Sequence, residues 1–107
     1  MIQVSNEDRG PTIDIDKLIH EPARLVIMAQ LYVVEEADFI FLMHQTGLTW
    51  GNLSSHMSKL EEAGYIEVRK EFLDKKPHTI LKLTQRGRDA FTEYRKAIDQ
   101  VFNDLPD

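Results

Sequence analysis

Residues 48–69 read LTWGNLSSHMSKLEEAGYIEVR, and this stretch decides the fold because a helix with two different faces ends at a glycine and passes directly into a strand. Leu53, Met57 and Leu60 recur at the i, i+4 and i+7 spacing, so they form one apolar stripe along a helix. Gly64 follows, and glycine can adopt the left-handed conformation that closes a helix. We therefore expect a helix at 49–63 that packs one side into a core.

The side opposite that stripe is polar, and we call it the polar face. Thr49 precedes it and is a suitable N-cap. Short hydrogen-bonding side chains and a basic one are what base edges and phosphates in a major groove require. The polar face consists of Trp50, Asn52, Ser54, Ser55, Ser58 and Lys59.

A shorter helix is expected upstream, at 38–46, and Gly47 separates it from the helix at 49–63 by only a few residues. Two helices joined by a tight turn that contains glycine form a helix-turn-helix arrangement. The sequence therefore predicts a helix-turn-helix unit over residues 38–63.

Downstream, two runs of β-forming residues, 65–68 and 79–83, flank the segment 72–78. That segment contains Asp74, Lys75, Lys76 and Pro77. We expect a hairpin with a basic tip.

Two stretches carry a resemblance to a known family: GLTWGNLSSHMSKLEEAGYIEV at 47–68 and LKLTQRGRDAF at 81–91. They resemble the recognition helix with its following strand, and the second wing strand with the start of the last helix, of winged helix-turn-helix transcriptional regulators of the MarR and ArsR kind. With the helix at 22–34, the resemblance spans nearly all of the chain from Leu18 onward. It implies an α+β fold, mostly α, with a two-stranded wing hairpin, long N- and C-terminal dimerisation helices, and double-stranded DNA as the partner.

The resemblance also implies which residues read DNA. One departure is Trp50, a bulky residue where such proteins more often have a small or charged one. The positions carried over are Thr49, Trp50, Asn52, Ser55, His56 and Lys59 in the helix at 49–63, and Lys75, Lys76 and His78 in the wing at 70–79.

Several of these residues have a structural alternative. Trp50 could pack at the joint of the helix-turn-helix unit, and His56 could close a hydrogen bond within the fold. Lys59 could be a solvated charge. Lys75 and Lys76 could simply make the hairpin tip soluble.

Composition limits the other function classes. A chain of 107 residues fits one domain, and we expect a flexible arm at 1–16 and the DNA-binding and dimerisation domain at 17–107. No apolar run approaches the roughly 20 residues of a membrane span, and the N-terminus lacks a secretory pattern, so a cytoplasmic location is expected. The absence of cysteine excludes thiolate metal sites and disulfides. No nucleophile with a base, metal-ligand set or nucleotide-binding glycine loop indicates an enzyme, a metal site or a cofactor.

The net charge of −5 argues against DNA until its distribution is considered. Residues 49–88 contain eight Lys and Arg against five Asp and Glu, whereas both flanking segments are acidic. Cations therefore gather where the predicted DNA surface lies, although the local excess is small.

Two helices indicate a homodimer. The helix at 22–34 is apolar nearly all round, and the last helix, after Thr84, carries an apolar stripe that runs beyond the reach of a small domain's core. A dimer would place two recognition helices on one face and bind a pseudo-palindromic operator, and we expect it to act as a repressor. The alternative is a winged-helix protein-protein interaction module that does not bind DNA. The sequence names no small-molecule effector. The expected interface residues are Leu25, Met28, Tyr32, Tyr94, Ile98, Val101 and Phe102.

Overall fold

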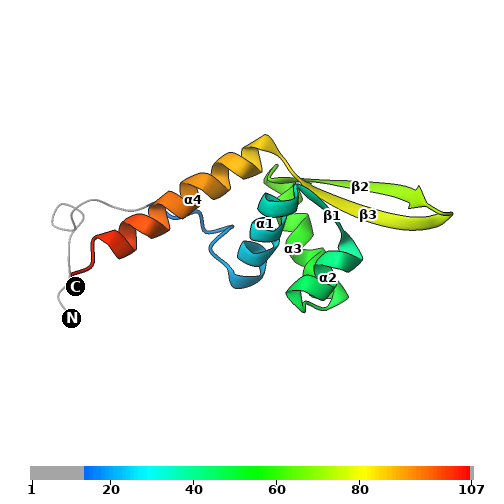
Figure 1. Cartoon of the computed structure of the whole chain (residues 1–107), viewed down its shortest axis with the longest axis horizontal. Helices are drawn as coiled ribbons and strands as arrows, with labels where there is room; N and C mark the ends of the chain where they lie inside the picture. The colour runs from blue at the N-terminus through cyan, green and yellow to red at the C-terminus, as the bar shows by residue number, and fades with distance from the viewer. Residues whose placement is uncertain (1–13, 107) are drawn as a thin grey trace.

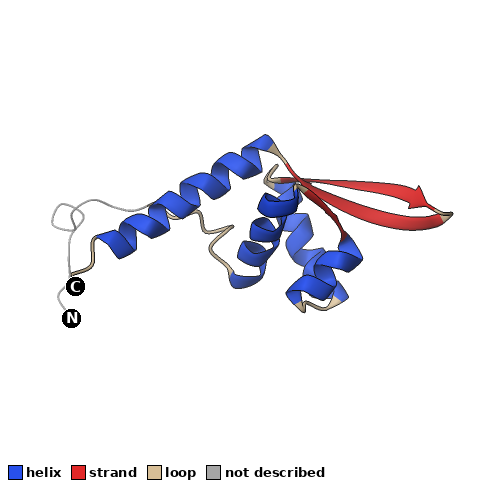
Figure 2. Ribbon diagram, in the orientation of Figure 1, coloured by secondary structure: helices blue, strands red, loops and turns tan. Residues whose placement is uncertain are grey.

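A computed structural model describes residues 14–106, in which three helices cluster beside a small antiparallel sheet and the last helix extends away from them (Figure 1). Figure 2 shows the helices and strands of this described part in separate colours. The elements are α1 (Pro22–Val34), β1 (Glu36–Asp38), α2 (Phe39–Thr46), α3 (Trp50–Glu62), β2 (Ile66–Leu73), β3 (Lys76–Leu83) and α4 (Gln85–Asn103). The predicted winged helix-turn-helix fold is confirmed.

The helix boundaries follow from capping residues. Thr49 Oγ1 accepts a hydrogen bond from Asn52 N at 3.2 Å, which confirms it as the N-cap of α3. Thr84 Oγ1 accepts from Gly87 N at 2.9 Å and donates to Gly64 O at 2.6 Å. Gly64 has a φ of +79°, as the predicted helix stop requires. The cap of α4 is thus bonded directly to the chain that leaves α3.

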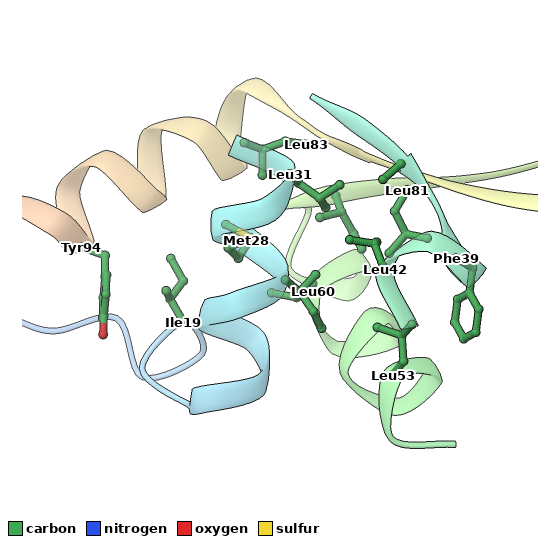
Figure 3. Close-up of a cluster of buried hydrophobic side chains, with 13 residues drawn as sticks. Ile19, Met28, Leu31, Phe39, Leu42, Leu53, Leu60, Leu81, Leu83 and Tyr94 are labelled. Atoms are coloured by element: carbon green, nitrogen blue, oxygen red, sulfur yellow. The ribbon is translucent and has the colours of Figure 1, made fainter. Parts of the chain in front are cut away.

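The core forms around α1, which contacts α2, α3, α4, β1 and β3. Leu53 and Leu60 of α3 are fully buried, and Met57 packs against the same cluster, as the apolar stripe predicts. Figure 3 shows side chains from α1, α2, α3 and the sheet converging on one another. The fully buried large side chains are Ile19, Ile27, Met28, Leu31, Leu42, Leu53, Leu60, Ile66 and Leu81.

The sheet has one more strand than the sequence predicts. The expected hairpin is present as β2 and β3, and β1 pairs with the other edge of β3 to give the order β1-β3-β2. The register places Glu36 opposite Lys82 and Asp38 opposite Ile80. Because β1 is short and acidic, its own sequence does not favour a strand, and pairing with β3 is what extends it.

The wing turn is also tighter than predicted. The strands continue to Leu73 and Lys76, so only Asp74 and Lys75 form the turn. Their φ values are 51° and 66°. Two successive positive φ values belong to the type I′ turn, whose twist matches that of the flanking strands.

The predicted arm at 1–16 falls mostly outside the described residues, but its end is part of the domain. Asp16 Oδ1 accepts from Leu18 N at 2.9 Å and from Ile19 N at 3.1 Å, and Asp16 Oδ2 accepts from the Tyr65 hydroxyl. Burial and this carboxylate raise the pKa of Tyr65 to about 12. Ile15 packs against the core. The domain therefore includes residues 15 and 16, because the apolar side chain of Ile15 and the carboxylate of Asp16 both find partners in it.

Gly87 is expected to be essential for the close approach of α4 to Tyr65, the residue that precedes β2. A Cβ at this position would lie 2.0 Å from Tyr65 O, so the backbone would have to shift. We expect Gly87→Ala to lower the free energy of unfolding by about 1–3 kcal/mol, measured by urea denaturation. Gly51→Ala is the matched control, because a Cβ there meets nothing within 4 Å, and it should raise stability by roughly 0.5 kcal/mol. Equal stability of Gly87→Ala and wild type would contradict this packing.

Candidate nucleic-acid interface

The outer side of α3 is available for contact along its length. Asn52, Ser55 and Lys59 are exposed, while the stripe opposite them lies in the core. A helix held by one side and polar on the other can enter a major groove without losing its packing. The structure thus presents the predicted polar face as a surface, with Ser54 half-buried at its margin.

The wing extends away from the helices as a two-stranded ribbon (Figure 1). We call residues 70–77 the wing tip. Its lysines, Lys70, Lys75 and Lys76, are all exposed. Lys70 lies in the predicted wing at 70–79 but was not among the residues predicted to contact DNA.

Arg69, in contrast, forms ion pairs with two acidic side chains. Its Nε donates to Glu71 Oε2 at 3.0 Å, and its Nη2 lies 3.4 Å from Glu36 Oε1. The hydrogen bond to Glu71, with the carboxylate of Glu36, raises the pKa of Arg69 above its ordinary value. The cations available to phosphate near α3 and the wing are therefore chiefly lysines.

A cavity of about 170 Å³ lies between the start of α3 and the first residues of β3 in the wing. It brings together three predicted DNA-binding residues, Trp50, Lys76 and His78, from two elements. The other residues that line this cavity were not predicted as site residues from the sequence. The lining is Asp38, Phe39, Ile40, Trp50, Lys76, Pro77, His78 and Thr79.

Trp50 packs in the fold and is also exposed. Its ring centroid lies 4.7 Å from that of Phe39, at an interplanar angle of 55°. The residue is nevertheless 62% exposed. One part of the ring therefore closes the helix-turn-helix joint, and the remainder is open at the beginning of the polar face.

His56 faces α1. Its Nδ1 lies 3.0 Å from Arg24 Nη1, and because a guanidinium only donates, Nδ1 accepts. Glu21 Oε2 is farther away, at 3.6 Å. His56 thus joins α3 to α1 and lies apart from the exposed side of the polar face.

His78 contacts Asp38, and both residues line the cavity. Its Nδ1 donates to Asp38 Oδ2 at 2.5 Å, while Asp38 Oδ1 accepts from Ile40 N at 2.7 Å as the N-cap of α2. Burial alone would raise the pKa of Asp38, but the hydrogen bonds from His78 and Ile40 N outweigh it and hold this pKa below its usual value. One carboxylate thereby joins the wing to the helix-turn-helix unit.

The predicted interface residues lie in different environments. Leu25, Tyr32, Ile98 and Val101 are half-buried, and Phe102 is 66% exposed. Met28 is fully buried in the core of the chain, and Tyr94 is buried with its hydroxyl 2.8 Å from His20 Nδ1. The structure therefore leaves Met28 no surface with which to meet a partner, because α1 turns this residue toward the core.

Residues 14–106 contain neither a membrane-spanning helix nor a cluster of metal ligands. No helix in this part combines the length and apolar character needed to cross a bilayer. Within the same residues, no group of three or more His, Asp or Glu side chains is arranged to hold a metal ion.

Comparison with known proteins gives consistent matches. The profile of the winged helix DNA-binding domain family matches residues 23–102. The uncharacterized protein MJ0432 of Methanocaldococcus jannaschii is 37% identical over 89 residues, which are 83% of this chain and 97% of that protein.

Solved structures agree with this match. A transcriptional regulator homologue from Pyrococcus horikoshii OT3 has a TM-score of 0.79 and 29% identity, covering 84% of this chain and 91% of its own. Overoxidized AbfR bound to DNA has a TM-score of 0.66 at 17% identity, over 82% of this chain and 66% of its own, and shows likeness of fold alone.

The Asp38–His78 contact should make stability depend on pH. Because the pKa of Asp38 is lowered on folding, its stabilising effect is present above the unfolded value of about 4 and is lost as pH falls through the folded pKa. Asp38→Asn keeps an N-cap side chain but lacks the charge. We expect it to be less stable than wild type by about 1 kcal/mol at pH 6, with the gap narrowing toward pH 3 in urea denaturation.

His78→Ala is the companion variant, because it removes the donor and leaves the cap. In the His78→Ala background, Asp38→Asn should lower the free energy of unfolding by less than it does in wild type, and this difference should depend less on pH. A gap that does not change between pH 6 and pH 3 would mean that this contact contributes nothing through its charge.

Proposed function

Because this chain belongs to the winged helix DNA-binding domain family, whose structural neighbours are MarR-family transcriptional regulators, we propose that it is a homodimeric repressor that binds a pseudo-palindromic operator. The observation that carries the proposal is the division of α3. Leu53 and Leu60 are fully buried, whereas Asn52, Ser55 and Lys59 are exposed. The helix is anchored by one side and offers hydrogen-bonding groups on the other.

On this proposal, α3 lies in the major groove. Asn52 and Ser55 have the donors and acceptors that base edges recognise, and Lys59 reaches a phosphate. Thr49 and the exposed part of Trp50 lie at the N-terminal end of the helix, which faces the bases in helix-turn-helix proteins. Lys75 and Lys76 contact the flanking backbone from the wing.

The homodimer is supported by apolar side chains that the subunit leaves uncovered. Val33 on α1 is 80% exposed, and Phe102 on α4 is 66% exposed. Figure 1 shows that the C-terminal half of α4 projects away from the helices and the sheet. A second copy packed along α1 and α4 covers these residues and sets two α3 helices on one face. A dimer bound over two grooves of a promoter blocks access to that promoter. Transcription from the promoter is then repressed.

A module that binds protein rather than DNA is the second candidate. The observation in its favour is electrostatic: the chain carries a net charge of −5, and Arg69 is neutralised by Glu71 and Glu36. DNA affinity depends on phosphate neutralisation, so a weak cationic set disfavours it. The polar face is the counter-argument, because a surface for protein binding is ordinarily rich in aromatic and apolar groups at its centre.

Selection from fragmented genomic DNA at low salt separates the two candidates. Full-length protein should enrich fragments that share an inverted repeat, and mobility-shift titration should give tighter binding to these than to shuffled duplexes. Transcription in vitro from an enriched promoter should fall when the protein is added. A chain that enriches no common sequence is not a sequence-specific regulator.

Removal of the two wing lysines tests the backbone contacts. Lys75→Ala with Lys76→Ala should weaken binding to all duplexes alike, and the slope of log affinity against log salt should flatten by roughly 0.9 for each phosphate that the variant no longer neutralises. Arg95→Ala with Lys96→Ala removes the same charge from an exposed part of α4 and is the control. An effect confined to one operator position would place these lysines at bases instead.

A charge at the end of α4 tests the dimer. Because Phe102 is exposed in the subunit, Phe102→Glu should leave the fold intact and shift the molecular mass toward one chain in light scattering. Gln45→Glu adds the same charge to the exposed side of α2 and should keep the wild-type mass. If wild-type protein is monomeric at micromolar concentration, both the proposed dimer interface and the proposed pseudo-palindromic operator are wrong.

A further inference from the structure

The indole ring of Trp50 is held in place at the start of α3 and is still open to solvent. Trp50 is the first residue of the helix, directly after the N-cap Thr49. Its ring packs against Phe39, yet the residue is 62% exposed. A ring that is already fixed on one side loses little conformational entropy when a ligand contacts its other side. Trp50 is therefore prepared to contact an external group at a defined place.

The cavity beside Trp50 determines what kind of group fits there. Its apolar walls are Phe39, Ile40, Trp50 and Pro77. Two polar members of its lining, Asp38 and His78, are hydrogen bonded to each other and so satisfy much of their own polarity. A surface cavity with apolar walls favours an apolar group. The surroundings of the exposed indole thus suit a small apolar substituent such as a methyl group.

The indole N–H of Trp50 adds a polar requirement. An indole nitrogen donates a hydrogen bond and does not accept one. The polar groups nearest to it have other partners, since Asp38 accepts from His78 and from Ile40 N, and Thr49 accepts from Asn52 N. Among residues 14–106 the indole N–H has no acceptor. An external group that combines a methyl with an adjacent acceptor oxygen satisfies both the ring and its N–H.

Thymine presents this combination on its major-groove edge. The edge carries the C5-methyl group and the O4 acceptor, whereas cytosine presents an amino donor in place of O4 and has no methyl group. Purines also lack the methyl group. The N-terminal residues of a recognition helix are the ones that contact base edges, and Trp50 opens α3. Thymine is therefore the base that the surroundings of Trp50 fit.

We propose that Trp50 is a specificity-determining residue, which selects thymine at one symmetry-related position in each half-site by contacting its C5-methyl group and O4. This inference rests on the proposed function. The ring meets the methyl group at the apolar side of the cavity, and the N–H donates to O4. Because a bulky ring at this position is the chain's departure from the pattern of its family, the selection of thymine is a property of this chain.

Base analogues test the proposal in the duplex enriched by wild-type protein. Each thymine of one half-site and its counterpart in the other are replaced by deoxyuridine, which lacks only the C5-methyl group. At one symmetric pair, binding should weaken by about fourfold for each methyl group removed. Cytosine at that pair should weaken binding by at least about tenfold, and 5-methylcytosine should recover only part of this loss, because it restores the methyl group and not O4.

Two variants of Trp50 separate the ring from its N–H. Trp50→Ala should bind the thymine and deoxyuridine duplexes with affinities that differ by less than about 1.5-fold. Trp50→Phe keeps a ring against Phe39 but has no N–H. It should retain the preference for thymine over deoxyuridine and lose part of the preference for thymine over 5-methylcytosine.

Phe41→Ala is the matched control. It removes another exposed aromatic ring of the helix-turn-helix unit, one that does not line the cavity, so it should retain both preferences of wild type. Thermal unfolding monitored by circular dichroism shows whether the variants remain folded. Trp50→Phe also keeps the test decisive if the alanine variant is unstable.

The outcomes separate this inference from the proposed function. If wild type enriches a duplex but tolerates deoxyuridine at every thymine, Trp50 does not read the methyl group and the inference is wrong. It is also wrong if Trp50→Ala binds more weakly but keeps the wild-type preference for thymine over deoxyuridine, because the ring then supplies affinity without specificity. Failure of wild type to enrich any duplex contradicts the proposed function itself.

Discussion

Burial of the inner side of α1 is the constraint on which the rest of the structure depends. Met28 and Leu31 are fully buried, and α1 contacts both helices of the helix-turn-helix unit as well as β1, β3 and α4. Truncation of such a core side chain to alanine costs about 2–5 kcal/mol. Because Leu53 and Leu60 of α3 are held in this core, the rotation of α3 about its axis is fixed by packing. The polar face is consequently exposed whatever residues occupy it, and its composition is free to serve recognition.

The junction between β1 and α2 connects this core to the wing. Asp38 ends a strand that pairs with β3, caps α2 and accepts a hydrogen bond from His78, so one residue relates the wing to the helix-turn-helix unit. Phe39, the next residue, supports the ring of Trp50 at the start of α3. Recognition by a helix and a wing requires that both reach the duplex at a fixed spacing. Short polar contacts at this junction are a physical means of fixing it.

Local patterns predict most of the fold, and contacts distant in the sequence account for what they miss. The cap at Thr49, the stop at Gly64 and the stripe of α3 are properties of adjacent residues, and all are found in the structure. The strand β1 is not, because an acidic segment becomes extended only by pairing with β3. His78 finds Asp38 40 residues away, and His56 finds Arg24 32 residues away, so neither engagement could be deduced from spacing. The periodicity of α1 likewise marks Met28 as apolar without showing which side of the helix the core takes.

In the proposed dimer, α3 and the wing form one DNA-contacting surface, and this surface occurs twice. Hydroxyl-radical footprinting on a genomically enriched duplex tests it most directly, since it maps the contacted sugars at nucleotide resolution. We expect two equivalent protected regions whose centres lie about one or two helical turns apart, each with an additional protected patch where the wing contacts the flanking backbone. A single protected region without a symmetric counterpart, or protection without the flanking patches, would contradict the claim.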